Sequence, residues 1–252
     1  MPFPFVENLI VRDEAESTND LARELVQGPG FVLPATIRAV RQTRGRGRGN
    51  NAWWSDEGSL TFTLALDPGA HGLERHHEPR LALMCAVAIV EALGEDSPGK
   101  GQIGIRWPND VEAQGRKLAG ILPERVDGPR PRLLLGVGVN VRTRLEDAPA
   151  EVRAMATSIA ELRGPGVPSV EQILWTFLQR IRAFLPLLAA DDPGLAAAWA
   201  RLDTLLGQPV RVRLPDRVLE GVGRGIDPEG ALLVATATGV ERLFGGQVLR
   251  EG

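Results

Sequence analysis

Cysteine is nearly absent from the 252-residue sequence, which has Cys85 alone and therefore cannot form an internal disulfide. A reducing cytosol is the simplest compartment for such a chain, so we expect it in the cytoplasm. Long apolar runs are also missing: the longest, at 81–90, is well short of the roughly 18 residues of a membrane span. The N-terminus has neither a basic leader nor a long apolar stretch. We therefore expect no membrane partner.

Lysine is scarce as well, and tyrosine is absent. Of the 29 basic residues only Lys100 and Lys117 are lysines, so arginine is the default cation of this chain. A lysine is a more compact point charge than an arginine, which makes each of the two conspicuous. The net charge of −3 argues against a general polyanion binder. The 43% hydrophobic and 24% charged residues exclude a disordered chain.

The patterning predicts an α+β fold in two parts. Residues 1–204 are expected to form the main domain and residues 205–252 a small all-β module. In the main domain, alternation and punctuation predict strands at 9–16, 36–42, 59–66, 103–107, 117–126 and 132–141, and helical periodicity predicts helices at 21–26, 80–93, 170–188 and 193–206. In the small module we expect short strands at 209–214, 218–226, 231–236 and 240–244.

A loop rich in glycine and arginine, at 44–53, is the most prominent motif. Its glycines let the backbone approach a ligand closely, and Arg46 and Arg48 offer forked donors to a carboxylate or phosphate. If the loop is extended, these two arginines point to the same side. Trp53 and Trp54 follow directly, as expected of a lid over an apolar ligand. A basic segment that binds nucleic acid is the alternative interpretation.

Two further motifs place polar groups at strand ends. The run Arg106-Trp107-Pro108-Asn109-Asp110 ends a predicted strand in a sharp turn with polar side chains. The next strand opens at Gly115-Arg116-Lys117, so Asp110 and Lys117 flank one hairpin and can face one site. The strand Gly136-Val137-Gly138-Val139-Asn140 contains glycines where a ligand could approach closely.

Metal-binding and hydrolase motifs are not evident. The candidate ligands His71, His76, His77 and Cys85 lack the paired spacing of a zinc site. The sequence also has no G-x-S-x-G elbow and no Walker loop.

Taken in order, the motifs resemble those of the biotin protein ligases. The matching segments are Ser17-Thr18-Asn19, Gln42-Thr43 with Gly45-Arg46-Gly47-Arg48-Gly49 and Trp53, Arg106 to Asp110, Gly115 to Leu122, and Gly136 to Asn140. The resemblance implies a mixed β-sheet with helices, like the catalytic domains related to class II aminoacyl-tRNA synthetases, followed by an SH3-like barrel. The family's usual lysine before Trp-Pro-Asn-Asp is replaced by Arg106, in keeping with the arginine bias.

The resemblance also implies the reaction. Such enzymes join biotin to ATP as biotinyl-5′-AMP, with Mg²⁺, and transfer biotin to a lysine of the biotin carboxyl carrier protein of acetyl-CoA carboxylase. Carried over position by position, the implied biotin-binding residues are Ser17, Thr18, Asn19, Gln42, Gly45, Arg46, Gly47, Arg48, Trp53, Lys117, Gly120 and Gly136. The implied ATP-binding residues are Arg46, Arg48, Trp53, Asn109, Lys117 and Asn140. The implied catalytic residues are Lys117, Arg46, Arg48 and Asp110, with Asp110 also the candidate Mg²⁺ ligand.

Two alternatives remain open from the sequence. A lipoate-type protein ligase would share the fold and the adenylate chemistry, and a non-catalytic nucleic-acid-binding protein would use the Gly-Arg loop and the small barrel. The first matched motif begins at Ser17, which leaves no room for the DNA-binding domain of bifunctional relatives, so we expect no DNA partner. A homodimer is compatible with the resemblance.

Overall fold

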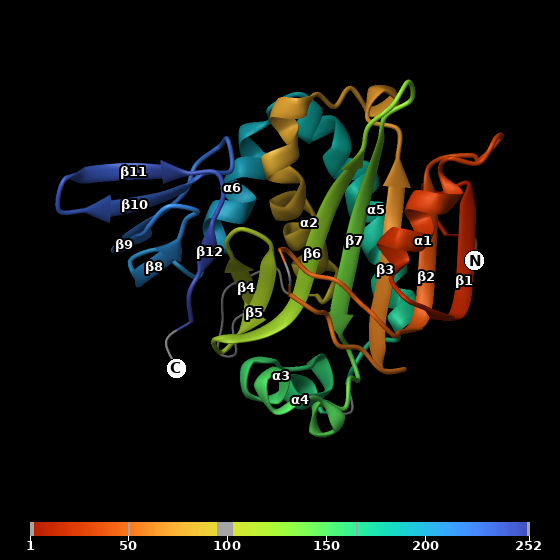
Figure 1. Cartoon of the computed structure of the whole chain (residues 1–252), viewed down its shortest axis with the longest axis horizontal. Coiled ribbons are helices and arrows are strands. Elements are labelled where there is room, and N and C mark those ends of the chain that lie inside the picture. The colour runs from red at the N-terminus through yellow and green to blue at the C-terminus, as the bar shows by residue number, and fades with distance from the viewer. Residues whose placement is uncertain (1–2, 50, 95–102, 165, 251–252) are drawn as a thin grey trace.

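The computed structural model describes residues 3–49, 51–94, 103–164 and 166–250, and Lys100 lies outside them. Two sheets dominate the described residues (Figure 1). The larger has seven strands in the order β1-β2-β3-β7-β6-β5-β4. Its strands are β1 (Asn8–Ala15), β2 (Ala35–Gln42), β3 (Ser59–Leu66), β4 (Ile103–Arg106), β5 (Asp110–Ala113), β6 (Arg116–Val126) and β7 (Arg132–Asn140). All neighbours are antiparallel except β1 and β2.

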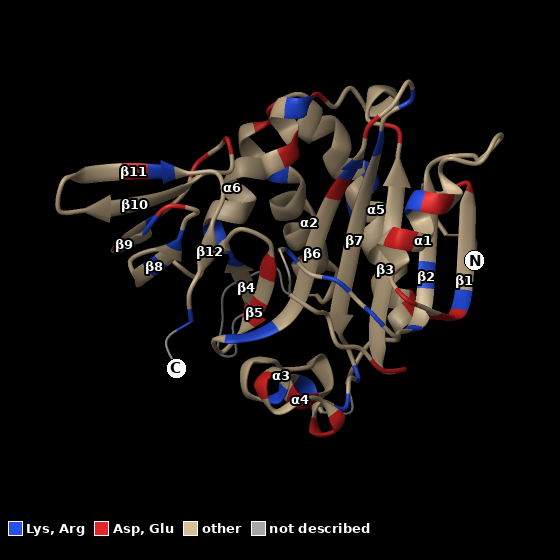
Figure 2. Ribbon diagram, in the orientation of Figure 1, with Lys and Arg blue, Asp and Glu red and all other residues tan. Residues whose placement is uncertain are grey.

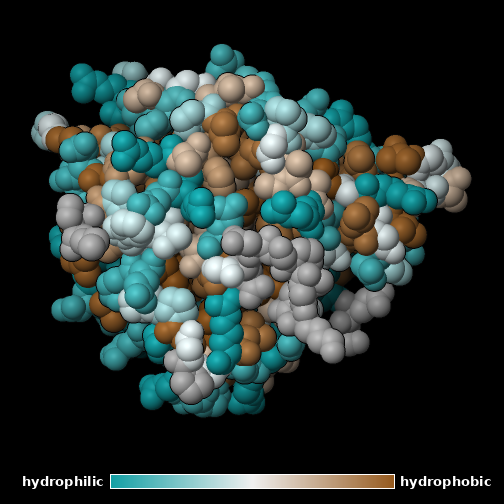
Figure 3. Space-filling view, turned by 180° about the vertical axis from the view of Figure 1, so that it is seen from behind, coloured by the Kyte–Doolittle hydropathy of each residue, from teal (hydrophilic) through white to brown (hydrophobic). Residues whose placement is uncertain are grey.

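Helices cover both faces of this sheet. The described helices are α1 (Thr18–Leu25), α2 (Glu78–Ala92), α3 (Ala150–Met155), α4 (Ile159–Arg163), α5 (Val170–Ala189) and α6 (Pro193–Arg201). A capping box of Ser169 and Gln172 starts α5. Helices α2 and α5 lie behind the sheet in Figure 1, and α1 lies in front. The rear surface mixes hydrophilic and apolar side chains (Figure 3), as expected of a layer that meets solvent on its outer side.

Strand β3 shows how the sequence divides the two faces. All eight residues of Ser-Leu-Thr-Phe-Thr-Leu-Ala-Leu are buried, because β3 lies inside the sheet. Leu60, Phe62 and Leu64 belong to the main core, where Phe62 meets Phe177 of α5 edge to face. Thr61 and Thr63 alternate with them and therefore face the other side. One face of the sheet thus builds the main core, and the other carries polar groups beside a smaller apolar cluster that includes Ala22 of α1 and Ile37 of β2.

The polar face also carries a row of glycines. On β7, Leu135, Val137 and Val139 join the main core, so Gly136 and Gly138 face the opposite side by the period of two. Gly120 of β6 is the register partner of Gly138. The absence of side chains leaves room on this face for Trp53, whose ring lies against Gly138 and Gly120. The row is the floor of the cleft described below.

The smaller sheet is antiparallel, in the order β11-β10-β9-β8-β12. Its strands are β8 (Pro209–Arg213), β9 (Val218–Ile226), β10 (Leu232–Thr236), β11 (Gly239–Leu243) and β12 (Gln247–Val248). Two buried tryptophans that precede this sheet in the chain form hydrogen bonds with its turn at 227–230. The Trp107 indole donates a hydrogen bond to the Gly230 carbonyl at 3.0 Å, and the Trp199 indole donates to the Asp227 carbonyl at 3.3 Å.

The predicted elements differ from the structure mainly at their ends. The helix expected over 21–26 begins at Thr18, with Ser17 at the N-cap. The helix expected over 193–206 ends at Arg201, because the chain turns there to bond with β4: the Ile105 amide donates to the Leu202 carbonyl at 2.7 Å. Strand β5 was not predicted as a separate strand. It separates β4 from β6, which were expected to be neighbours within a group of three.

The burial of Cys85 leads to a first prediction. The side chain is fully buried in α2, and burial raises the pKa of its thiol far above the ordinary range. Because the thiolate is the reactive form, we expect no labelling by a thiol reagent in the native protein at pH 8 and complete labelling in denaturant. The measurement is the mass of the labelled protein. Stoichiometric labelling under native conditions would contradict this placement of α2.

No described helix is both long and apolar enough to cross a bilayer.

Candidate functional site

A cleft of about 990 Å³ opens over the glycine row. The loop at 44–53 crosses this face of the large sheet, and its basic residues and those at the start of β6 are blue in Figure 2. The small sheet provides the far wall. Most of the residues that the resemblance implies line the cleft, and Gly45 is not among the lining residues: those present are Ser17, Thr18, Asn19, Gln42, Arg46, Gly47, Arg48, Trp53, Asn109, Asp110, Lys117, Gly120, Gly136 and Asn140.

The end near α1 is a corner of buried polar groups. The Thr18 amide donates to Gln42 Oε1 at 2.7 Å, which fixes the orientation of the Gln42 amide. Thr63 Oγ1 lies 2.9 Å from Thr18 Oγ1 and 2.6 Å from Asn19 Oδ1. These groups are held before any ligand arrives, so the corner is preorganised for a ligand that accepts and donates hydrogen bonds.

Asn19 helps to tie this corner to β6. Its Nδ2 donates to the Leu122 carbonyl at 3.2 Å and to Glu124 Oε2 at 2.9 Å. The side chain also fills the space above Gly136, where a Cβ would come 2.9 Å from Asn19 Cγ. The polar atoms of Asn19 are therefore already used within the protein, which favours a supporting role.

Arg46 is held by two carboxylates. Its guanidinium donates to Asp20 Oδ1 at 2.7 Å and to Glu124 Oε1 at 3.0 Å. The hydrogen bond to Glu124 raises the pKa of Arg46. Burial would raise the pKa of Glu124, but the hydrogen bonds from Arg46 and Asn19 outweigh it and hold that pKa below the ordinary value. The start of the loop is thus fastened to α1 and β6.

Arg48 points away from Arg46, because the extended loop that would have placed both arginines on one side is not formed. Arg48 Nη1 donates to the Gly246 carbonyl of the small domain at 3.1 Å. The loop is not extended: it folds back on itself, with the Trp53 amide donating to the Gly45 carbonyl at 2.8 Å. Burial lowers the pKa of Arg48, although nearby Asp110 opposes the shift.

Trp53 and Lys117 meet over the glycine row. A Cβ at Gly138 would lie 2.6 Å from Trp53 Cζ2, so only glycine fits under the ring. Lys117 Nζ lies 5.7 Å from the centre of the Trp53 ring, a cation–π distance. Trp53 Nε1 is buried and has no hydrogen-bond partner among the described residues. A tryptophan donor without a partner beside a cation is an arrangement suited to an anionic or carbonyl-bearing ligand.

Lys117 Nζ pairs with Asp110 Oδ1 at 2.6 Å across the β5–β6 hairpin, which confirms that the two residues share one site. The two asparagines expected to contact the nucleotide hold this hairpin. Asn109 Nδ2 donates to the Ile121 carbonyl at 2.7 Å, and Asn140 Nδ2 donates to the Thr157 carbonyl at 3.0 Å. The Thr157 amide in turn donates to the Lys117 carbonyl at 2.9 Å, so Asn140 supports the backbone that carries Lys117.

Sequence reasoning missed several cleft residues. Arg106 lines the cleft, but the sequence had placed it within a motif without assigning it a binding role. Arg211, Arg213 and Arg250 line the wall contributed by the small domain. No local motif marked these arginines, because the fold alone brings the small domain beside the loop.

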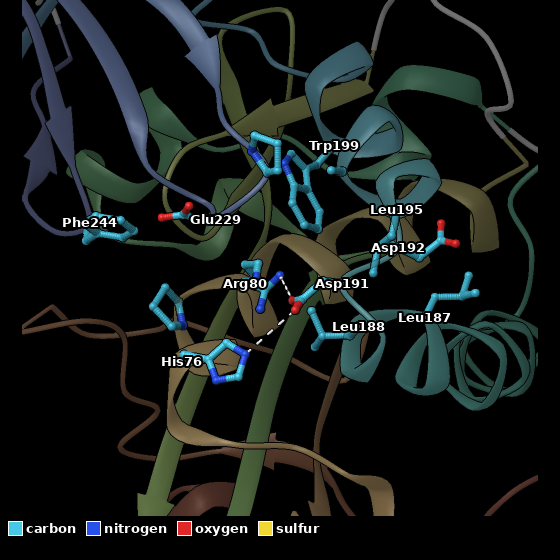
Figure 4. Close-up of a pocket in the computed structure, with 13 residues that line it drawn as sticks. His76, Arg80, Leu187, Leu188, Asp191, Asp192, Leu195, Trp199, Glu229 and Phe244 are labelled. Atoms are coloured by element: carbon cyan, nitrogen blue, oxygen red, sulfur yellow. Dashed lines mark hydrogen bonds and ion pairs between the residues drawn. The ribbon is translucent and has the colours of Figure 1, made fainter.

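A second cavity, of about 580 Å³, lies between α2, α6 and the 227–230 turn (Figure 4). His76 and His77 approach Asp191 here, at 4.0 and 3.7 Å, which looks like a metal site. However, the Glu74 amide donates to His77 Nδ1, so the proton of a neutral ring is on Nε2 and that nitrogen has no lone pair to offer. Asp191 is instead bound to Arg80 at 2.6 Å.

Comparisons with known proteins give a consistent result. Residues 15–140 match the Biotin/lipoate A/B protein ligase family, and residues 205–249 match the Biotin protein ligase C terminal domain. The Biotin--[acetyl-CoA-carboxylase] ligase of Paracoccus denitrificans is 32% identical over 92% of this chain and 98% of its own length. The Bifunctional ligase/repressor BirA of Bacillus subtilis is 31% identical over 96% of this chain and 74% of its own.

Among solved structures, the biotin protein ligase from Aquifex aeolicus in complex with biotin and ATP superimposes with a TM-score of 0.80. The two are 28% identical, and the match covers 96% of this chain and 98% of the other. The mixed sheet followed by a small β domain is therefore the architecture of that protein, as the sequence predicted. With both domain matches in chain order and a relative that is 32% identical over 98% of its own length, the chain belongs to the biotin protein ligase family.

Proposed function

We propose that this protein activates biotin with ATP as biotinyl-5′-AMP and transfers the biotinyl group to a lysine of the biotin carboxyl carrier protein of acetyl-CoA carboxylase. The observation that carries the proposal is the Lys117–Asp110 pair beside Trp53, at the centre of a cleft with the family's motifs around it. The identities of the substrates are inferred from the relatives named above.

The cleft suits the parts of biotin. The preorganised corner of Thr18 and Gln42 fits the ureido group, and the Trp53 ring, which lies on the glycine row, offers an apolar surface to the bicycle and tail. The biotin carboxylate then points toward Lys117. A lipoate ligase would not need the polar corner, because lipoate has no ureido group. This contrast favours biotin over lipoate.

The first step brings two anions together, since the biotin carboxylate attacks the α-phosphorus of ATP and releases pyrophosphate. Lys117 and Arg48 offset this repulsion by electrostatic stabilisation of the developing charge. Arg46 is placed differently, because its guanidinium is already bound to Asp20 and Glu124. We therefore assign Arg46 the task of holding the loop in place over the bound substrate.

ATP enters as its Mg²⁺ complex. A single carboxylate together with phosphate oxygens is a usual ligand set for Mg²⁺, and Asp110 supplies the carboxylate at the edge of the cleft. Asp110 also pairs with Lys117, so it faces both the nucleotide and the acyl group. In the second step the carrier lysine must lose a proton to attack the adenylate, and Asp110 is our candidate base.

The decisive experiment is isotope exchange between pyrophosphate and ATP. We expect exchange that depends on biotin and not on lipoate, followed by labelling of a purified carrier domain. A nucleic-acid-binding protein would show no exchange and a steep salt dependence of RNA binding. Exchange that depends on lipoate and not on biotin would refute the proposal and favour a lipoate ligase. We further propose that the protein acts in the cytoplasm and does not bind DNA. A homodimer is a further proposal, and gel filtration of the purified protein tests it.

The glycine row leads to a second prediction. In Gly138→Ala the added Cβ would force the Trp53 ring off the sheet. We expect the KM for biotin in the exchange reaction to rise about tenfold, as for the loss of about 1.4 kcal/mol of binding. Gly166→Ala is the matched control, because Gly166 has nothing within 4 Å of an added Cβ. Unchanged biotin KM in Gly138→Ala would show that Trp53 does not cover the biotin.

A further inference from the structure

A buried carboxylate outside the family motifs lies behind the cleft wall. Glu112 of β5 is 5% exposed, although β5 begins at Asp110 in the cleft itself. Glu112 Oε1 accepts a hydrogen bond from Thr204 Oγ1 at 2.7 Å. A buried carboxylate is costly unless cations or donors compensate it, so its other neighbours decide its role.

Those neighbours are two arginines from different parts of the fold. Arg250, after β12, places Nη1 3.2 Å from Glu112 Oε2. Arg106, at the end of β4, places Nη1 3.8 Å from Glu112 Oε1. Arg106 Nη2 also donates to the Leu249 carbonyl at 3.1 Å, which joins the two segments. Glu112 is thus the charge partner of one arginine of the catalytic domain and one of the small domain, and its Oε2 has no hydrogen-bond partner among the described residues.

Both arginines line the cleft beyond this anchor. Arg250 Nη2 is buried and has no hydrogen-bond partner among the described residues. Burial lowers the pKa of Arg106, while the charge of Glu112 opposes that shift. Arg250 Nη1 also donates to the Gly115 carbonyl, so this guanidinium is held from two sides while its side chain borders the cleft. A guanidinium held in this way is preorganised to receive an anion.

We propose that Glu112 is a positioning residue that holds Arg106 and Arg250 as a pair against the phosphates of bound ATP. The inference rests on the proposed function. It predicts that removing Glu112 changes the affinity for ATP in the direction opposite to that expected from charge repulsion alone. A carboxylate near a polyphosphate repels it, so if only charge mattered, removing Glu112 would tighten ATP binding. If Glu112 positions the arginines, removing it weakens ATP binding.

The test is Glu112→Gln, which keeps an oxygen for Thr204 and removes the charge. We expect the KM for ATP in the exchange reaction to rise about tenfold, with the KM for biotin within twofold of wild type. Glu112→Asp keeps the charge and should recover part of the loss. The matched control is Asp203→Asn, which neutralises a nearby carboxylate whose pKa burial raises to about 6, and it should leave both KM values unchanged.

A double-mutant cycle with Arg250→Ala decides whether Glu112 acts through the arginine. We expect Glu112→Gln to raise the KM for ATP less in an Arg250→Ala background than in the wild type, because only Arg106 is then left for Glu112 to hold. A lower or unchanged KM for ATP in Glu112→Gln overturns the proposal, and so does an equal rise in both KM values with a lower melting temperature. If Glu112→Gln does not fold, the same cycle is measured with Glu112→Asp. Its effect on the KM for ATP is then compared in the presence and absence of Arg250. Absence of exchange in the wild type would instead refute the proposed function.

Discussion

Lys117→Ala is expected to reduce biotin-dependent exchange between pyrophosphate and ATP by at least about 100-fold, the usual effect of removing a preorganised group that stabilises transition-state charge. Lys117 Nζ lies 2.6 Å from Asp110 and over the Trp53 ring, and its removal takes away the cation that we propose to act where the biotin carboxylate and the α-phosphate of ATP meet. It also leaves the Asp110 carboxylate without its partner. The measurement is the exchange rate at saturating biotin and ATP.

Arg116→Ala is the matched control for this variant. Arg116 precedes Lys117 on β6 but pairs with Glu161 of α4 at 2.7 Å. We expect it to retain exchange within about twofold, since an exposed ion pair contributes little to stability. Near-normal exchange in a folded Lys117→Ala protein would refute the role proposed for this lysine.

Arg48→Gly is expected to make the adenylate but to lose it into solution. A charge-assisted contact contributes about 1.5–3 kcal/mol, which corresponds to roughly a ten- to hundredfold faster escape if it all appears in the off-rate. Free biotinyl-AMP acylates lysines indiscriminately, so bystander proteins should become biotinylated. The experiment incubates the variant with biotin, ATP and a non-carrier protein and detects biotin on that protein.

The matched control is Arg44→Gly, which makes the same substitution in the same loop. Arg44 points outward to Glu16, at 3.1 Å, and does not line the cleft. It therefore separates added loop flexibility from the loss of a guanidinium at the adenylate. If Arg48→Gly forms the adenylate but labels bystanders no more than the wild type, Arg48 does not retain the intermediate.

Short-range features of the site could be predicted from the sequence. Asp110 and Lys117 are brought together by one hairpin, so their spacing along the chain was sufficient. Gly136 and Gly138 lie on one face because residues two apart on a strand always do. Most strands of the large sheet likewise follow from alternation and from the turns between them. The individual binding and catalytic roles remain predictions.

Contacts between distant segments could not be predicted in this way. Arg46 is bound by Glu124, 78 residues away, and Arg48 reaches Gly246 in the other domain. Neither partner belongs to a motif. Strand β5 escaped prediction for a related reason: its sequence Asp-Val-Glu-Ala puts a carboxylate at a buried position, and two of its compensating partners, Thr204 and Arg250, come from distant parts of the chain.

The indole of Trp107 has a consequence for how shortened versions of this protein would behave. Its hydrogen-bond acceptor is Gly230, and the next residues along the chain are Pro108, Asn109 and Asp110. A chain cut before β8 would lose this acceptor and uncover the indole, which directly precedes the turn that carries Asp110. Such a chain would lose activity even if the removed part contacted no substrate. Loss of activity in such a truncated chain would therefore report the support that the small domain gives to the turn carrying Asp110. Point substitutions on the surface of the small domain are needed to reveal contacts between that domain and the ligands.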